Sequence, residues 1–534
     1  MATCGSGPTP PLPGRGKMAD KTLLAFDCGT QSIRALIFGL DGRLLAGSRV
    51  PYDPYRSPGP GLAEQDPEIY WEGLVTASVR LKKEYPQFFS DLAGVGVTTQ
   101  RATMVNVDSD GRVLRPAIVW LDQRRARPCF AARGLMGAVA RLSGLKAKLD
   151  AAQSQAKCSW IRQNQPEIWE ATHKYLQVSG FLNFRLTGEF ADATASQIGH
   201  LPFDYKKQKW AGAWGLTPRL FPVEPEKLPR LVCPGQILGG VTQRAADLTG
   251  IPAATPVVAC GSDKGCETLG SGVVDQTLVS LSFGTTATVQ TTSKKYFEAI
   301  PLMPPYPAPM PGYYNPEVEI FRGFWMISWF KKEFAHKEVE AARKLKVPPE
   351  KLLDQCLQRT RPGAMGLVVQ PYWSPGLDHP HAKGAMIGFG DVHTRDHVYR
   401  AVIEGLGFAL KEGMEKIQSK GGVTVKGAAL SGGASQSDAI CQIASDIFNL
   451  PMSRAATHET SGLGAALLTA AGIGAYDTIN EAAARMTRPA AHFSPDPGHA
   501  RIYQELYGGV YKKIYKALSP LHTQIQRITG YPER

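Results

Sequence analysis

A hairpin pattern that occurs twice, once in each half of the chain, constrains the fold more than any other sequence feature. An apolar run at residues 22–26 leads into Asp-Cys-Gly-Thr at 27–30, and a second apolar run follows at 34–38. The same order recurs at 277–290, where an apolar run leads into Phe-Gly-Thr-Thr and a partner run. Each copy predicts two strands joined by a tight turn. Because the same unit recurs far along the chain, we predict two domains of related design.

The length of the chain agrees with two domains, because 534 residues exceed what one hydrophobic core usually supports. The small residues Gly270-Ser271-Gly272 suit a hinge, and we place the domain boundary there. The expected order is a flexible N-terminal extension at 1–19, an N-terminal domain at 20–270, a C-terminal domain at 271–518 and a tail at 519–534.

Hydrophobic patterning predicts several further elements. The Asp-Gly turn at 41–42 leads into a third strand through Val50, which completes a β-meander. An amphipathic helix is expected at 68–83, a buried strand at 92–98 and a core helix at 397–417. The Pro-rich stretch at 301–316 is expected to be a rigid surface loop.

Composition argues against several classes of protein. The net charge is +13, but Lys and Arg are dispersed among acidic residues, so we expect no nucleic-acid partner. No run reaches the roughly eighteen apolar residues of a membrane helix, and 1–19 lacks the apolar core of a signal peptide, so we expect no membrane partner. The nine cysteines are scattered without a Cys-x-x-Cys pair. This argues against a disulfide framework and a zinc site, and favours a cytoplasmic location.

The first hairpin has the residues of a phosphate site. Gly29 in a tight turn lets backbone N–H groups approach phosphate oxygens, and Thr30 adds a hydroxyl. Gln31 completes the turn. Asp27 can hold a hydrated magnesium ion, and Arg34 can balance phosphate charge. An ordinary hairpin turn explains the same residues and remains an alternative.

Two glycine-rich turns in the second half are candidates for the rest of a nucleotide site. Gly284 and Thr285 could bind terminal phosphates from the opposite side. Gly432 and Gly433 follow a strand, and the stretch that they begin ends at Ser437, where a helix through Phe448 follows. Such a step gives a flat backbone surface and free N–H donors for an adenosine group. Structural turns are again an alternative, and the chain has no P-loop motif.

A carboxylate and a polar cluster complete the candidate chemistry. Asp263 follows an apolar strand at 256–260 and can accept a proton from a substrate hydroxyl. Carbohydrate sites combine an aromatic plate with hydrogen-bonding side chains, and Gln100, Arg101, Trp120 and Asp122 supply both. A buried tryptophan with surface charges is the alternative for this cluster.

Taken together, these motifs resemble the FGGY family of carbohydrate kinases over residues 22–518. The matching stretches are 26–34, 283–285, 383–388 through Glu404-Gly405, 431–437, and Glu459 with 462–466; Asp263 falls on the family's catalytic base. The resemblance implies an α/β fold of two actin-like, ribonuclease-H-like domains with an ATP and substrate cleft between them. It also implies ATP-dependent phosphorylation of a carbohydrate hydroxyl with Mg²⁺, in a homo-oligomer that is a dimer or a tetramer.

The identity of the carbohydrate is less constrained. Gln100-Arg101 resembles the glycerol kinase pattern, but Ala102 stands where those enzymes have glutamate, and Lys264 stands where they have glutamine. The Met-His-Gly typical of xylulokinases is absent. Lys264 as a substrate-binding cation would favour a sugar acid or a ketose.

Two alternatives from other functional classes remain open. A non-catalytic nucleotide sensor or an actin-like or chaperone-like ATPase needs the phosphate turns but not Asp263 beside a polar, aromatic pocket. A carbohydrate-binding regulator would bind sugar and leave ATP intact. The presence of Asp263 together with the polar cluster favours the kinase.

Overall fold

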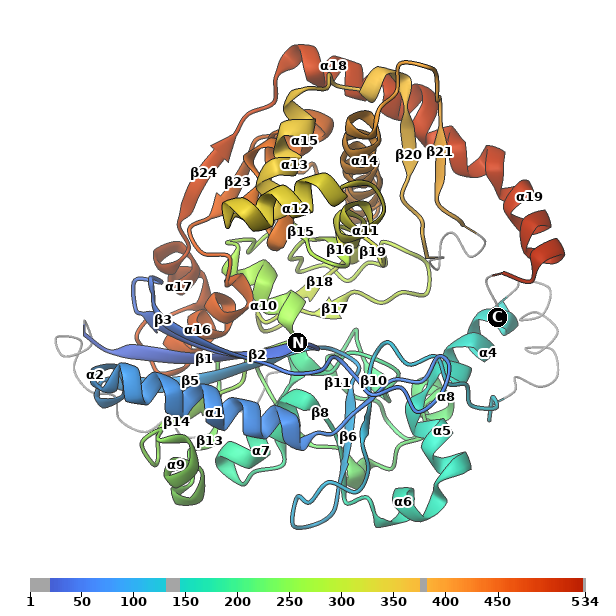
Figure 1. The fold of residues 1–534 in the computed structure, drawn as a ribbon. Helices are drawn as coiled ribbons and strands as arrows, with labels where there is room; N and C mark the ends of the chain where they lie inside the picture. The colour runs from blue at the N-terminus through green and yellow to red at the C-terminus, as the bar shows by residue number, and fades with distance from the viewer. Residues whose placement is uncertain (1–19, 131–144, 375–381, 532–534) are drawn as a thin grey trace. The chain divides into compact units, whose positions relative to one another are not determined.

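The computed structural model describes residues 20–130, 145–374 and 382–531, which form two compact units (Figure 1). The first unit comprises the described residues of Met1–Gly270, Tyr306–Tyr314 and Glu459–Thr487; the second comprises the described residues of Ser271–Pro305, Asn315–His458 and Arg488–Arg534. The chain therefore leaves the first unit after Gly270 and returns to it twice. The domains expected from the sequence differ from these units in the two returning segments. The expected C-terminal domain at 271–518 contains both segments, whereas the structure assigns them to the first unit.

A six-stranded sheet forms the centre of the first unit. Its strands are β1 (Thr22–Cys28), β2 (Ser32–Gly39), β3 (Leu44–Pro51), β5 (Leu92–Thr99), β13 (Ile237–Gly240) and β14 (Pro256–Val258). The strand order is β13-β14-β5-β1-β2-β3. β1 pairs antiparallel with β2 and parallel with β5, and β5 runs parallel to β14. The predicted meander and the predicted strand at 92–98 are confirmed.

Helices cover both faces of this sheet, which explains why β1 is buried along its whole length. The helices near the sheet are α1 (Glu68–Glu84), α7 (Val178–Thr187), α9 (Gln243–Thr249), α10 (Asp263–Gly270) and α16 (Thr460–Gly472). α1 packs against β2 and β3, whereas α16 packs against β1, β5 and α10. Figure 1 shows α1 and α16 on opposite faces of the sheet. The predicted helix at 68–83 is confirmed.

A four-stranded sheet extends the first unit. Its strands are β4 (Glu64–Gln65), β7 (Ala117–Ile118), β6 (Met104–Val107) and β8 (Lys174–Gln177), in that order. A separate apolar core lies beside it and includes Ile161 and Trp169. α4 (Leu145–Gln155) and α5 (Lys157–Asn164) precede β8 in the chain. This part of the unit positions the residues that follow β5 and β7.

The Pro-rich stretch is not a surface loop throughout, so that expectation is wrong for its central part. β17 (Tyr306–Pro307) and β18 (Tyr314–Asn315) form a two-stranded hairpin, in which the N–H of Ala308 donates to the carbonyl of Tyr313. Ala308 and Met310 are buried. The hairpin belongs to the first unit because its apolar side chains, and not its prolines alone, are buried there.

The second unit also has a six-stranded sheet at its centre. Its strands, in spatial order, are β19 (Glu317–Ile320), β16 (Ala287–Gln290), β15 (Leu278–Phe283), β22 (Gly427–Ser431), β23 (Met452–Ala455) and β24 (Pro489–Phe493). β15 pairs antiparallel with β16 and parallel with β22. α14 (Arg395–Gly421) packs against β16, β19 and α15 (Asp438–Phe448). The predicted second hairpin and the predicted helix at 397–417 are confirmed.

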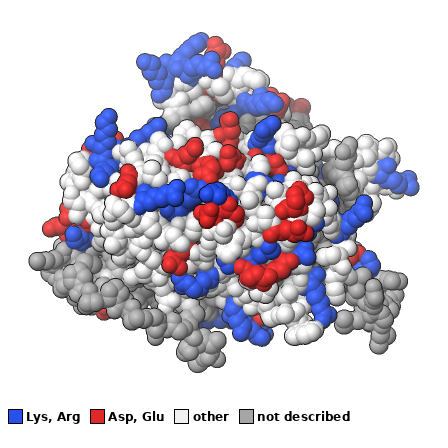
Figure 2. All heavy atoms as spheres, turned by 90° about the horizontal axis from the view of Figure 1, so that it is seen from below, with Lys and Arg blue, Asp and Glu red and all other residues white. Residues whose placement is uncertain are grey.

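The surface and the cysteines bear on the compositional expectations. Lys and Arg side chains alternate with Asp and Glu over the face that Figure 2 shows. Among the described residues, no helix combines the length and the apolar character that crossing a membrane requires. Among the described residues, seven cysteines have free thiols and Cys233 is disulfide-bonded, a bond that the sequence did not predict.

Candidate active site

Three neighbouring parallel strands of the first unit end at the same edge of its sheet. β1 ends beside β5 with Asp27 opposite Thr98, and Thr99 forms a bridge with Ser262 after β14. The residues at or just after these strand ends are Asp27, Gln100 and Asp263. Ligands in open α/β sheets bind outside the carboxyl ends of parallel strands. The topology therefore brings together three of the residues that the sequence singled out.

Asp27 is buried in a cluster of charged side chains. It lies opposite Arg34 in the β1–β2 register, and Arg34 Nη2 is 3.3 Å from Asp27 Oδ2. Arg34 also donates to Glu459, the residue before α16. Burial raises the pKa of Asp27 to about 6 despite Arg34, and the negative charges of Asp263, Glu459 and Glu267 raise it further. Glu459 thus belongs to this cluster.

The first turn presents backbone donors. The N–H of Gly29 donates to the carbonyl of Ser32, which closes the hairpin at 3.0 Å. Tyr52 donates its hydroxyl to the carbonyl of Gly29. Among the described residues, the backbone N–H groups of Thr30 and Gln31 have no hydrogen-bond partner. These two groups are available to phosphate oxygens.

A chain of side-chain hydrogen bonds connects this turn to the polar cluster. Thr30 donates its hydroxyl to Gln100 Oε1 at 2.9 Å and accepts from Trp120 Nε1 at 3.0 Å. Gln100 donates to the hydroxyl of Tyr70, which donates to Gln65. The Thr30 hydroxyl is therefore used to orient Gln100 and Trp120. Trp120 keeps 37% of its surface exposed, as an aromatic plate for a ligand requires.

Arg101 has an aromatic partner that sequence reasoning missed. Its guanidinium carbon lies 4.9 Å from the ring centroid of Tyr306, and Tyr306 packs near Tyr205. Tyr306 reaches this place on the hairpin that returns to the first unit. No local sequence signal marks such a contact, because about 200 residues separate Arg101 from Tyr306 and pattern rules cover only neighbouring residues.

Asp263 begins α10 and is influenced by two cations. Burial raises the pKa of Asp263, whereas the positive charges of Arg101 and Lys264 oppose the rise. Its Oδ1 accepts from the backbone N–H of Lys264 at 2.8 Å. Such a carboxylate combines a raised basicity with a position at the strand ends, which suits a general base.

Lys264 is paired within its own helix. Its Nζ lies 2.7 Å from Glu267 Oε2, three residues along α10. Burial lowers the pKa of Lys264, but Glu267 and Asp263 outweigh it and raise the pKa overall. Because Glu267 compensates its charge, Lys264 gives little reason to restrict the substrate to anions.

Asp122 lies inside the protein. Its side chain has no exposed surface, and its two oxygens accept from Arg124 Nε and Nη2 at 2.7 and 2.8 Å. Oδ2 also accepts from the backbone N–H of Ala63 at 2.7 Å. A direct contact with substrate would require this carboxylate to leave Arg124. Its neighbour Trp120, by contrast, remains accessible.

In the second unit, the two glycine-rich turns lie against each other. Gly432 has a φ of +83°, and a Cβ there would lie 2.7 Å from the carbonyl carbon of Phe283 and 2.9 Å from the nitrogen of Gly284. Thr285 is exposed, and a Cβ at Gly433 would meet open space. Only glycine at 432 allows this approach. Ser437 is engaged differently: it caps α15 and donates to Asp354.

Comparisons with known proteins agree with this arrangement. The model of the FGGY family of carbohydrate kinases, N-terminal domain, matches residues 22–270, and that of the C-terminal domain matches 279–473. The sugar kinase YgcE of Escherichia coli (strain K12) is 28% identical over 93% of this chain and 94% of its own length. The xylulose kinase of Bacillus subtilis (strain 168) is 26% identical over 95% and 99%. The crystal structure of xylulose kinase from Rhodospirillum rubrum superposes with a TM-score of 0.79 at 26% identity, covering 94% of this chain and all of that one.

Proposed function

Since the chain belongs to the FGGY family of carbohydrate kinases, and is therefore an ATP-dependent sugar kinase with the family's two-domain actin-like fold, we propose that Asp263 is its catalytic base. The main support for this proposal is that Asp27, Gln100 and Asp263 lie at the same edge of one sheet. Gln100 and Trp120 would orient the sugar, and Asp263 would remove the proton of the attacking hydroxyl.

In the proposed reaction, the sugar hydroxyl attacks the γ-phosphorus of ATP, the bond to the β-phosphate oxygen breaks, and Asp263 accepts the hydroxyl proton. Positioning and charge neutralisation contribute most to phosphoryl transfer, and a base adds about 10²-fold or more. The raised pKa of Asp263 supports this role, because a more basic carboxylate accepts the proton more readily.

Asp27 is the residue that we propose to hold magnesium. Within the described chain, no group of three or more His, Cys, Asp or Glu side chains is arranged to hold a metal ion. The chemistry of Asp27 nevertheless fits Mg²⁺, which often uses one carboxylate together with phosphate oxygens and water. Burial raises the pKa of Asp27 most and nearby carboxylates raise it further, and a bound cation would relieve the repulsion from these carboxylates. Bound Mg²⁺ would supply neutralisation of phosphate charge.

The nucleotide would be held by glycine-rich turns. We propose that the backbone N–H groups of Thr30 and Gln31 donate hydrogen bonds to the γ-phosphate and that Arg34, which lies nearby, balances its charge. Gly284 and Thr285 would serve the remaining phosphates, and the open backbone at 432–433 would face the adenosine. Ser437 would act mainly as the helix cap beside this step.

The proposed substrate is a small carbohydrate whose hydroxyls meet Gln100 and Arg101 while its C–H face lies on Trp120. The pairing of Lys264 with Glu267 leaves neutral polyols and ketoses as candidates beside sugar acids. From the family resemblance we also propose a cytoplasmic homo-oligomer, a dimer or a tetramer, which light scattering on the purified protein would test.

Sugar-stimulated release of ADP tests the proposal. Purified protein is assayed with Mg-ATP against a panel of polyols, ketoses and sugar acids, in parallel with the Asp263→Asn variant. We expect one class to stimulate ADP release from the wild type and much less from the variant. If no member of a broad panel stimulates release, the protein is better explained as a non-catalytic nucleotide-binding protein of the same fold.

A further inference from the structure

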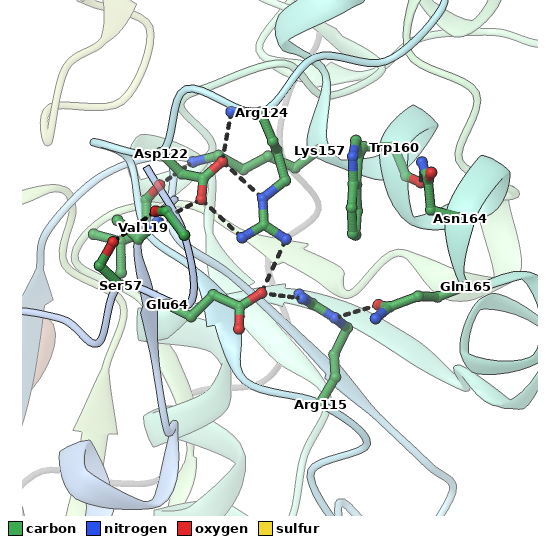
Figure 3. A network of polar contacts seen from close by, with 12 residues as sticks. Ser57, Glu64, Arg115, Val119, Asp122, Arg124, Lys157, Trp160, Asn164 and Gln165 are labelled. Atoms are coloured by element: carbon green, nitrogen blue, oxygen red, sulfur yellow. Dashed lines mark hydrogen bonds and ion pairs between the residues drawn. The ribbon is translucent and has the colours of Figure 1, made fainter. Parts of the chain in front are cut away.

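Figure 3 shows a network of polar contacts that includes Lys157, Val119, Asp122 and Arg124. At the start of α5, Lys157 donates from Nζ to the carbonyl of Ala102 at 2.8 Å and to the carbonyl of Val119 at 2.7 Å. Ala102 directly follows Arg101, and Val119 directly precedes Trp120. One side chain therefore joins the two segments that carry the proposed sugar contacts.

The backbone at one of these carbonyls is strained. Ala102 has a φ of +54°, in the left-handed region that residues with a Cβ rarely adopt. Strained conformations persist where surrounding contacts determine them, and they cluster at functional sites. The hydrogen bond from Lys157 to the Ala102 carbonyl is a contact of this kind. It fixes the backbone from which Arg101 projects.

A second layer of charges supports the segment after Val119. Arg124 binds Asp122 through two hydrogen bonds and also lies 2.9 Å from Glu64, which pairs with Arg115. The Arg124 guanidinium lies over the ring of Trp160, 4.5 Å from its centroid. Trp160 lies one helical turn after Lys157, so α5 supports the segment at two points.

Lys157 suits a structural contact with carbonyl groups. It is partly buried, and burial lowers its pKa to about 7 although Asp122 opposes the shift. Both forms of the amine carry at least two N–H donors, enough for both carbonyls. The contact thus does not depend on whether Lys157 is charged.

We propose that Lys157 is a positioning residue for sugar recognition, which sets the relative placement of Arg101 and Trp120 by holding the carbonyls of Ala102 and Val119. The inference rests on the proposed function of these two side chains. Small displacements of binding groups reduce reactivity strongly, since a shift of about 1 Å can cost about a hundredfold. Within the part of the chain that the structure describes, Lys157 donates to these two carbonyls and to none of the turns proposed to bind ATP.

A matched pair of variants tests this role. Lys157→Met keeps the aliphatic stem and removes the donors. Lys174→Met is the control, because Lys174 is also partly buried and donates to two carbonyls, those of Glu226 and Leu228, which lie outside the proposed sugar segments. Both purified full-length variants are compared with the wild type for the KM of the sugar, the KM of ATP, kcat, sugar binding by calorimetry and thermal stability.

We expect Lys157→Met to raise the sugar KM and the sugar Kd about tenfold or more, with the ATP KM changed less than about twofold. Lys174→Met should leave both KM values near those of the wild type. Equal sugar KM values in the two variants, or a parallel rise of the sugar and ATP KM values in Lys157→Met, would overturn the inference while the proposed function stands. Absence of sugar-stimulated turnover in the wild type would instead overturn the proposed function.

Lys157→Gln keeps the test decisive if Lys157→Met fails to fold. A glutamine amide retains two N–H donors on a shorter side chain and reaches at most one of the two carbonyls. We expect its sugar KM to rise by about threefold to tenfold with the ATP KM unchanged. A sugar KM equal to that of the wild type would contradict the role of Lys157.

Discussion

Arg34 of β2 pairs with Asp27 of β1, with 3.3 Å between Arg34 Nη2 and Asp27 Oδ2, and the same guanidinium binds Glu459. Two carboxylates thus share one cation in a buried place, and Asp263 and Glu267 add to the negative charge that Asp27 experiences. Such an excess of negative charge is unfavourable in the protein alone and becomes favourable when a cation binds. The predictions for Asp27 follow from this imbalance.

Replacing Asp27 by Asn should stabilise the protein above pH 6. The pKa of Asp27 is about 6 in the folded protein and lower in the unfolded chain, so the folded state holds this proton more tightly. The contribution of Asp27 to the free energy of unfolding is therefore fully present below pH 4 and is lost as the pH rises through 6. We expect Asp27→Asn to raise the free energy of unfolding by about 1–3 kcal/mol at pH 8, and by little at pH 4. Urea unfolding at both pH values measures the difference.

The exposed Asp53 provides the control, because Asp53→Asn should shift neither curve. An Asp27→Asn variant that is less stable than the wild type at pH 8 contradicts this prediction.

The Asp27→Asn variant should also need more Mg²⁺ for half-maximal turnover, and chelation of Mg²⁺ should abolish activity in the wild type. An unchanged magnesium dependence counts against Asp27 as the metal-holding residue.

Replacing Asp263 by Asn should remove the proposed base and leave the fold intact. The amide has nearly the same shape and can no longer accept the hydroxyl proton. We expect kcat to fall by about 10²-fold or more, with the KM of ATP nearly unchanged. Steady-state kinetics and circular dichroism measure both effects. Turnover within a few-fold of the wild type would remove Asp263 from the mechanism.

Replacing Tyr306 by Ala should weaken sugar binding through Arg101. The stacked ring holds the guanidinium in place, and cation–π contacts of this kind contribute about 0.5–2 kcal/mol. We expect the sugar KM to rise by about twofold to thirtyfold, with Tyr306→Phe close to the wild type. Tyr314→Ala on the partner strand of the hairpin is the control. If both alanine variants behave alike, the effect belongs to the hairpin and not to the stacking.

Two adjacent glycines of the second unit should respond differently to alanine. At Gly432 the new methyl group would meet the backbone of Phe283 in a left-handed conformation, so we expect a loss of about 1–3 kcal/mol in stability. At Gly433 the methyl group would meet open space, and Gly433→Ala should fold normally. If Gly433 lies beside the adenosine, its variant should raise the KM of ATP alone. Thermal unfolding and ATP titrations distinguish the two, and equal destabilisation by both would refute the explanation.

The sequence predicted features that depend on neighbouring residues. The two Gly-Thr hairpins, the helix at 68–83 and the strand before Asp263 are encoded by local apolar patterns and turn residues, and the structure contains each of them. The placement of Asp27, Gln100 and Asp263 together follows once the strands are known to be parallel neighbours.

Contacts between distant segments were beyond such reasoning. Tyr306 was expected in a surface loop, whereas it lies on a hairpin that belongs to the first unit. Asp122 was expected to bind substrate, yet both of its carboxylate oxygens accept hydrogen bonds from Arg124. Which side chain pairs with which depends on the three-dimensional packing of segments that no local periodicity relates.

The return of Glu459–Thr487 to the first unit has a consequence for biosynthesis. α16 packs on β1 and β5, so apolar surface of these strands stays uncovered until the ribosome has made residues more than 350 positions downstream of Leu92–Thr99. The first unit therefore cannot complete its fold as it emerges, unlike domains that are continuous in the chain. A nascent chain stalled near residue 300 should depend on chaperones to avoid aggregation.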